Sequence, residues 1–326
     1  MIAWATVATA VVGTTAVIPA ALAAAPTVLD QHIAVNWSGA AHRTTTATAT
    51  VPGIGSLQAI CAPNDTMVQL TANNRDAETQ MWAAVYEQKK GGWSVAVKTV
   101  RIYRYANADD SGKGGTGTKG NEGFNQSTPQ EDSSTGYIHG VISQRPGRNE
   151  TAATKVLAPV TSFELTWWWS GFRHGASAQS CHVDVHMVTN LKTPVGVDWH
   201  GSSDAAHGTS RSATISPIGT FALSCRNSAI GGQTLTVTPP KGKVAWLYTE
   251  TITGEGPVDN QVDVSERGID PKTGALGPVP LPQNGMLRLF ITVGSVQYRY
   301  IVSSYYVTNN TKHPELNLCE VAASSW

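Results

Sequence analysis

TSFELTWWWSGFRHGASAQSCHVDVHMV, residues 161 to 188, contains two runs of alternating residues joined by a turn rich in glycine and serine. Side chains alternate between the two faces of a β-strand, so each run has one apolar face and one mostly polar face. We expect the two runs to pair as a β-hairpin with the apolar faces in a core. These faces consist of Phe163, Leu165, Trp167 and Trp169 in the first run and Cys181, Val183, Val185 and Met187 in the second.

The other face of the predicted hairpin carries a candidate ligand site. Glu164 and Trp168 lie on it in the first run. An exposed aromatic ring can stack on the apolar face of a sugar, so these two residues predict a ligand-binding surface. The alternative is that Trp168 packs beneath a loop or at a domain interface, as most large aromatic side chains do.

The second run places His182, Asp184 and His186 on the same face. Imidazole and carboxylate groups suit zinc or a similar ion, with Glu164 or His174 as further ligands. Neighbouring side chains on one strand face are about 7 Å apart, so three of them do not converge on one ion by themselves. A solvated polar face is therefore the alternative to a metal site.

Other site motifs are weak. Asn107, Asp109, Ser111 and Gly112 imitate the first half of a calcium-binding loop, but Thr118 stands where that loop needs a glutamate. No G-x-S-x-G, H-E-x-x-H, P-loop or G-x-G-x-x-G motif occurs. We expect no catalytic residues and no cofactor, with zinc or calcium as the alternative.

Composition narrows the class of protein. The 326 residues include 23 basic and 23 acidic ones, and charged residues make up 14%. Such a chain has no strong field for nucleic acid or an acidic membrane surface, so neither is an expected partner. The 31 glycines and 17 prolines, in a chain also rich in threonine and valine, are typical of many short strands joined by turns.

The N-terminal segment predicts export. Residues 1–23 contain no charged side chain and end in Ala21-Leu22-Ala23, which fits a signal-peptide cleavage site. A positively charged start is missing, which leaves retention as a membrane anchor as the alternative; Pro19 and the polar residues disfavour a stable span. We expect a secreted protein, extracellular or at the cell surface.

A repeat runs through the chain. AVNWSG at 34–39 returns as GVDWHG at 196–201, and ATVPGIGSLQAIC at 49–61 returns as ATISPIGTFALSC at 213–225. Near the end of each unit an aromatic cluster precedes a cysteine, and Trp167 precedes Cys181 by as many residues as Tyr305 precedes Cys319. The fixed order of matched features indicates a tandem duplication of one domain.

The duplication predicts two β-sandwich domains, jelly-roll or immunoglobulin-like, over 31–190 and 194–326. Because the matched cysteines recur once in each unit, we expect one disulfide in each domain, Cys61 with Cys181 and Cys225 with Cys319. The Gly-rich residues 106–136 should form a flexible insert in the first domain, and the Pro-rich residues 253–285 a long loop in the second.

Three functions fit this organisation. The first is a secreted, non-enzymatic binding protein that contacts a polysaccharide, another cell-surface component or another protein. The second is a secreted metal-dependent hydrolase that uses the face of His182, Asp184 and His186. The third is a structural subunit of an extracellular layer or appendage. The absence of a catalytic motif favours the first over the second.

Overall fold

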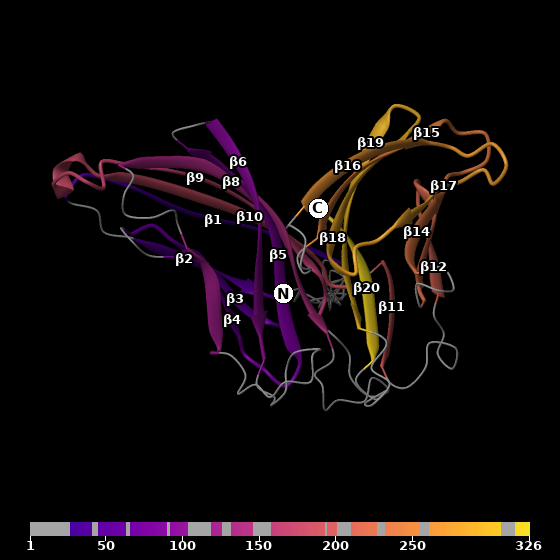
Figure 1. Cartoon of the computed structure of the whole chain (residues 1–326), viewed down its shortest axis with the longest axis horizontal. Coiled ribbons are helices and arrows are strands. Elements are labelled where there is room, and N and C mark those ends of the chain that lie inside the picture. The colour runs from indigo at the N-terminus through magenta and orange to yellow at the C-terminus, as the bar shows by residue number, and fades with distance from the viewer. Residues whose placement is uncertain are drawn as a thin grey trace, which may run out of the picture.

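A computed structural model of the chain describes residues 27–40, 45–62, 66–89, 92–103, 119–125, 132–145, 158–192, 194–200, 210–226, 232–253, 261–307 and 317–326. The strands in these ranges form four antiparallel sheets, arranged as two sandwich-like halves side by side (Figure 1). This confirms the predicted all-β class and its tandem organisation.

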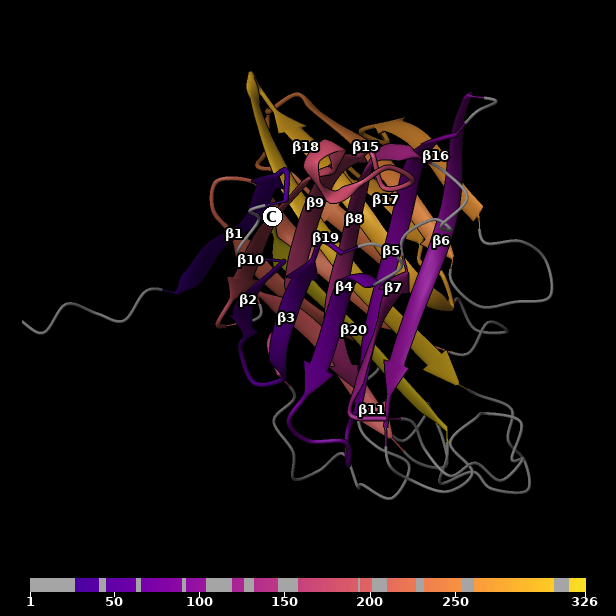
Figure 2. The same ribbon diagram turned by 90° about the vertical axis from the view of Figure 1, so that its left-hand side faces the viewer.

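In the first half, a six-stranded sheet of order β1-β10-β9-β8-β5-β6 packs on a four-stranded sheet of order β2-β3-β4-β7. Figure 2 shows the smaller sheet lying against the larger one. The strands are β1 Val28–Ser38, β2 Thr46–Val51, β3 Gly55–Ile60, β4 Thr66–Ala72, β5 Glu78–Lys89, β6 Gly92–Ile102, β7 Asn121–Asn125, β8 Ser133–Arg145, β9 Thr161–Ser170 and β10 Ser180–Asn190; a 3-10 turn, Ala176–Ala178, joins the last two.

The second half repeats this topology strand for strand. Its sheets have the orders β11-β20-β19-β18-β15-β16 and β12-β13-β14-β17. The strands are β11 Val195–His200, β12 Ser210–Ile215, β13 Gly219–Cys225, β14 Gln233–Thr238, β15 Ala245–Thr253, β16 Gln261–Gly268, β17 Leu276–Pro280, β18 Asn284–Val293, β19 Val296–Val307 and β20 Leu318–Ser325.

Both predicted disulfides form, Cys61–Cys181 and Cys225–Cys319, with Cα atoms 6.1 and 6.3 Å apart. A tryptophan marks the same place in each half. The indole N–H of Trp37 donates to the carbonyl of Cys61 at 3.2 Å, and that of Trp199 to the carbonyl of Cys225 at 3.0 Å. This recurrence in detail supports the duplication read from the sequence.

The hairpin of residues 161 to 188 forms as predicted. β9 and β10 pair antiparallel with Trp168 opposite His182, and the eight apolar-face residues of the two strands are buried in the first core. The core accommodates Trp167 because the facing residue on β8 is Gly136, where a Cβ atom would lie 2.1 Å from the Trp167 ring. Alternation therefore decides which side chains of β9 reach the core.

The structure corrects the alignment of the two aromatic clusters by one residue. Trp169 lies opposite Cys181, whereas Tyr306 lies opposite Cys319, so Tyr305 corresponds to Trp168 and not to Trp167. The connection before the second cysteine is one residue longer in the second half, which shifts the spacing. Tyr305 thus faces the other half of the molecule and does not enter its own core.

Two segments predicted as loops contain strands. β7 lies within residues 106–136, pairs with β4 and buries Phe124. β16 and β17 lie within 253–285 and pair with β15 and β14. All three are edge strands; β7 and β16 are mostly polar and β17 contains two prolines, which an edge strand tolerates, so composition alone missed them. The first strand also begins at Val28, ahead of the expected boundary at Gln31.

The halves meet through the outer faces of their six-stranded sheets. Trp82, Ala84 and Val141 from the first half pack with residues of the second, including Ile252, Met286, Ile301 and Tyr305. These faces alternate with the core faces along the same strands, so one strand serves both its own core and the contact between the halves.

The predicted signal peptide, residues 1–23, lies outside the described residues. Within the described part of the chain, no helix is long and apolar enough to cross a membrane. The two disulfides indicate an oxidising compartment, because such bonds persist there and are rare in the reducing cytosol.

Candidate functional site

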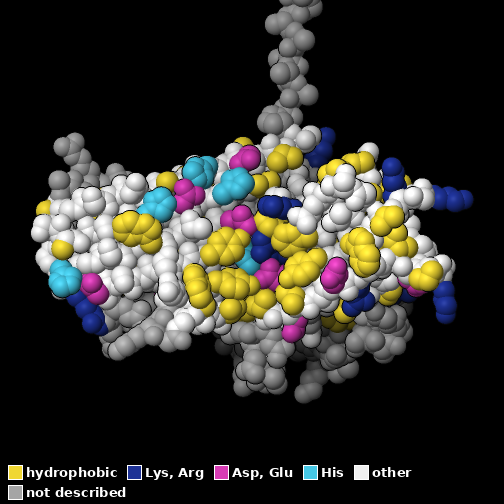
Figure 3. Space-filling view, turned by 90° about the horizontal axis from the view of Figure 1, so that it is seen from above, with side chains coloured by type: hydrophobic (Ala, Val, Ile, Leu, Met, Phe, Trp, Pro, Cys, Tyr) yellow, Lys and Arg dark blue, Asp and Glu magenta, His cyan; other side chains and the backbone are white. Residues whose placement is uncertain are grey.

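The two six-stranded sheets touch at one end and diverge at the other, and the C-terminus lies between them (Figure 1). Viewed from the diverging end, the surface is hollowed there: charged and histidine side chains lie in the middle, with hydrophobic side chains around them (Figure 3). We call this hollow the cleft. Its residues come from β5, β8 and β9 on one side and from β15, β18 and the C-terminus on the other.

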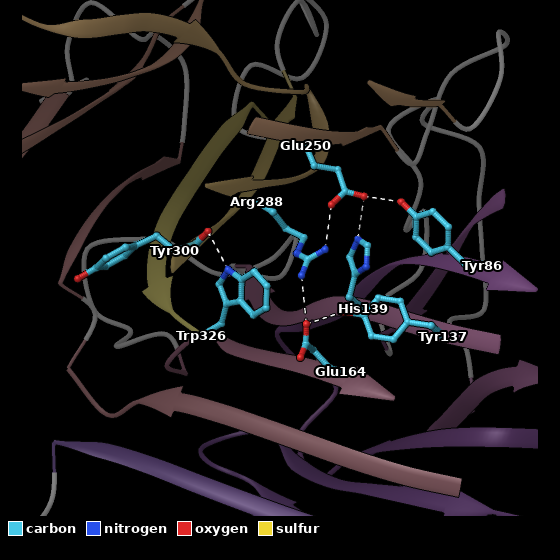
Figure 4. Close-up of polar contacts among 8 residues, drawn as sticks. All are labelled: Tyr86, Tyr137, His139, Glu164, Glu250, Arg288, Tyr300 and Trp326. Carbon is cyan, nitrogen blue, oxygen red and sulfur yellow. Dashed lines mark hydrogen bonds and ion pairs between the residues drawn. The ribbon is translucent and has the colours of Figure 1, made fainter. Parts of the chain in front are cut away.

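Arg288 forms the centre of the cleft floor (Figure 4). One of its nitrogens, Nη1, donates to Glu250 Oε2 at 2.9 Å, and the other, Nη2, donates to Glu164 Oε1 at 3.1 Å. Glu250 is its neighbour on β15, while Glu164 belongs to β9 of the first half. The guanidinium therefore joins two carboxylates from different halves of the molecule.

Two tyrosines extend this network toward the first half. The hydroxyl of Tyr86 donates to Glu250 Oε1 at 2.5 Å, and the hydroxyl of Tyr137 donates to Glu164 Oε1. His139 lies between them, 2% exposed, with Nε2 3.1 Å from Glu250 Oε1. Neither Nδ1 nor Nε2 of this ring makes a hydrogen bond among the described residues, so the floor retains unmatched polar atoms.

Ionisation in the floor is set by burial and by these contacts. Burial alone would raise the pKa of Glu250, but its contacts with His139, Tyr86 and Arg288 outweigh this and lower the pKa to about 2. Burial lowers the pKa of His139, and burial with the adjacent carboxylates raises the pKa of both Tyr86 and Tyr137. At neutral pH the floor therefore holds an ionised Glu250 and neutral His139, Tyr86 and Tyr137.

Aromatic rings form the walls of the cleft. On the first half, the rings of Tyr86 and Tyr137 lie with centroids 6.2 Å apart, and both pack on the buried His139 ring of the floor, at 5.4 and 5.3 Å. On the second half, Phe290 contacts Tyr248 and Trp326 edge-on, at 5.6 and 5.5 Å. The wall of the second half is also held by the Arg288 guanidinium, 4.0 Å from the ring centre of Trp326.

Trp326 is fixed in this wall by a second contact. Its indole N–H donates to the carbonyl of Tyr300 at 3.2 Å. Large hydrophobic side chains also remain exposed on the facing sheets around the cleft. They are Trp93, Val95 and Trp168 on the first half and Trp246, Tyr248 and Val264 on the second.

Of the residues singled out from the sequence, Glu164 lies in the cleft floor and Trp168 lies farther along the same strand face. Trp168 is 48% exposed, so it neither enters the core nor packs beneath another element. The strand pairing places Trp168 beside His182 and places Glu164 between His186 and His139. The predicted ligand-binding pair thus shares one continuous sheet face.

Two members of the row of His182, Asp184 and His186 are paired with side chains of β1 instead of with one another. His32 Nε2 lies 2.7 Å from Asp184 Oδ1, and His186 Nε2 lies 2.7 Å from Asp30 Oδ1. Among the described residues, no group of three or more histidine, cysteine, aspartate or glutamate side chains is arranged to hold a metal ion. The proposed calcium loop, 107–118, lies outside the described residues.

The other suggested metal ligand, His174, lies in the turn after β9, with Nε2 3.5 Å from Asp132 Oδ2. It is therefore paired with a residue outside the row on β10.

Sequence reasoning missed Arg288, Glu250 and His139. Arg288 and His139 lie among mostly apolar residues, in MLRLF and YIHGV, whereas Glu250 lies between two threonines in YTETI. A single charged or histidine residue within a strand of mostly uncharged residues indicates a second buried surface, because such a side chain is rarely buried without a partner. That signal was present, but it does not say which of these residues meet.

Comparison of the chain with protein families, with curated proteins and with solved structures gives no match.

Proposed function

We propose that the protein is an exported, non-enzymatic carbohydrate-binding protein whose ligand lies in the cleft between the two halves. The observation that carries this proposal is the pair of aromatic walls, one from each half, above a floor of buried and mutually bonded polar groups.

The walls suit sugar rings. A pyranose has an apolar C–H face and a rim of hydroxyl groups, and an aromatic side chain can cover the first while leaving the second accessible. The exposed Tyr248 and Trp168 offer such surfaces on opposite sides of the cleft. Binding sites usually combine a mostly apolar lining with a few fixed polar groups, as this cleft does.

The floor suits recognition by hydrogen bonds. Glu164 is about one-third exposed at its side chain, so it can accept a bond from a ligand hydroxyl while it holds Arg288. Because the floor residues already hold one another, they lose little freedom when a ligand arrives. This rigidity favours a polar, uncharged ligand whose shape matches the cleft.

The same network argues against turnover. Glycoside hydrolysis needs a carboxylic acid that is protonated at working pH and can donate to the leaving oxygen. The contacts with His139, Tyr86 and Arg288 keep the pKa of Glu250 low. Glu250 is therefore ionised at neutral pH and does not supply that proton.

The proposal is tested by binding of the purified chain to insoluble neutral polysaccharides, namely cellulose, chitin, xylan and mannan. We expect retention on at least one of them, and loss of retention in Tyr248→Ala. Val244→Ala, which removes an exposed hydrophobic side chain in the turn before β15, is the matched control and should bind as the wild type does. No retention on any of the four, or equal retention of Tyr248→Ala, overturns the proposal.

A further inference from the structure

We infer, resting on the proposed function, that the ligand is a neutral β-1,4-linked polysaccharide that extends out of the cleft and crosses the strands of the first half along one row of side chains. This row is Asn36, His182, Trp168, Thr135, Gln88 and Trp93, and we call it the rim row.

The register of the sheet defines the rim row. Trp168 lies opposite His182 on one side and Thr135 on the other. Thr135 lies opposite Gln88, and Gln88 lies opposite Trp93. Asn36 on β1 lies opposite His182. Residues directly opposite in antiparallel strands point to the same face, so these side chains form a line across β1, β10, β9, β8, β5 and β6. The next row along the strands contains Tyr137 and Tyr86 of the cleft wall.

Two exposed indoles mark this line. Trp168 is 48% and Trp93 64% exposed. Three strand spacings separate them, which is about 14 Å at the usual distance between strands. That separation exceeds a single sugar ring, so one monosaccharide cannot stack on both indoles. Successive rings of a flat, extended chain can.

The side chains between the indoles suit sugar hydroxyls. Gln88 is exposed and offers an amide, and Thr135 has a hydroxyl that donates to the carbonyl of Trp167 at 3.1 Å and can still accept. The rim row carries no lysine, arginine or carboxylate. In the cleft, Arg288 is bonded to two carboxylates. Among the described side chains of the row, a polymer of uronic acids or phosphates would therefore find no lysine or arginine partner, which favours a neutral chain.

The test is calorimetric titration with β-1,4-linked oligosaccharides of glucose and of N-acetylglucosamine, each as dimer, tetramer and hexamer. We expect one of the two hexamers to bind at least about 10-fold more tightly than its dimer, since a second aromatic contact is a typical binding hot spot. Trp93→Ala should weaken hexamer binding about 10-fold and leave dimer binding unchanged. Val296→Ala, which alters an exposed side chain at the first position of β19, is the control and should match the wild type.

Affinity that does not rise with chain length, or hexamer binding that Trp93→Ala leaves intact, would overturn the inference while the cleft remains a binding site. Absence of binding to both oligosaccharide series, together with no retention on insoluble polysaccharides, would overturn the proposed function and this inference with it. Thermal unfolding of each variant, followed by circular dichroism, ensures that lost binding does not reflect a lost fold.

Discussion

Arg288 connects the halves through a charge that is almost fully removed from water. Its side chain and that of Glu250 are each 8% exposed. Burying charges is costly, and a buried ion pair repays this cost only when the geometry is good and the remaining hydrogen bonds are made. Here one guanidinium satisfies two carboxylates, which in turn accept from two tyrosines. The group stabilises the arrangement of the cleft as a unit.

Replacing Arg288 tests this role. Arg288→Leu leaves the buried Glu250 without its cation and should lower the free energy of unfolding by about 3–5 kcal/mol. Arg299→Leu removes an exposed guanidinium that rests 5.2 Å from the ring centre of Trp326, and should change stability by less than about 1 kcal/mol. Urea denaturation of both variants makes the comparison; equal losses would contradict the account.

Glu320 is a second buried carboxyl, and its pKa is shifted in the opposite direction from that of Glu250. Burial, and secondarily Asp198, raise its pKa from 4.5 to about 8, although Arg145 opposes the shift. Below pH 4.5 the folded and unfolded forms are both protonated, so the group does not disfavour folding. Between pH 4.5 and about 8 only the unfolded form ionises, so stability falls as pH rises.

Glu320→Gln removes this titration. The variant should match the wild type near pH 4.5 and become progressively more stable than it toward pH 8. Urea midpoints at several pH values across that range provide the measurement. A variant that loses stability at the alkaline end would show that Glu320 is ionised and held by a cation there.

Adjacent tryptophans on β9 should behave differently. Trp167 is 2% exposed and packs on Gly136, so Trp167→Ala should cost about 3–5 kcal/mol of stability. Trp168→Ala should change stability by less than about 1 kcal/mol, because the indole is exposed, and should weaken ligand binding instead. Chemical denaturation and calorimetry on the same pair of proteins separate the two roles.

At the level of strands, the alternation in residues 161 to 188 was sufficient to predict the hairpin, its buried face and the position of Trp168. The repeat predicted both disulfides, because each cysteine of one half has an equivalent cysteine in the other half, and the pairing must be the same in both. It did not give the register of the aromatic clusters, since one extra residue in a connection is invisible to a comparison of spacings. The strands β7 and β16 were hidden by polar composition, and β17 by its two prolines.

Each disulfide should stabilise its own half. The bridges close segments of 120 and 94 residues, which corresponds to about 4–5 kcal/mol each in the chain-entropy model. Cys225→Ala with Cys319→Ala should lower the unfolding temperature of the second half more than that of the first, and the matching pair in the first half should do the reverse. Amide hydrogen exchange measured in each half compares their stabilities. An equal loss of protection in both halves would mean that they unfold as one unit.

At the scale of the whole molecule, the sequence predicted two halves but not how they meet. The outer faces of the large sheets mix apolar, aromatic and charged residues, which in a single sheet resembles a solvated face. These faces are recognised as a contact surface only when the two halves are packed together, which places Glu164 beside Arg288 and Trp82 beside residues of the second half. The cleft is a product of that packing, and no local pattern encodes it.

The central claim is that both halves form one binding site, and a double-mutant cycle tests it most directly. Wild type, Trp168→Ala, Tyr248→Ala and the double variant would be titrated with the hexamer that the wild type binds. The account predicts that each single variant weakens binding about 10-fold and that the double variant shows almost none. Full affinity in either single variant would show that one half binds alone, and would contradict a site shared between them.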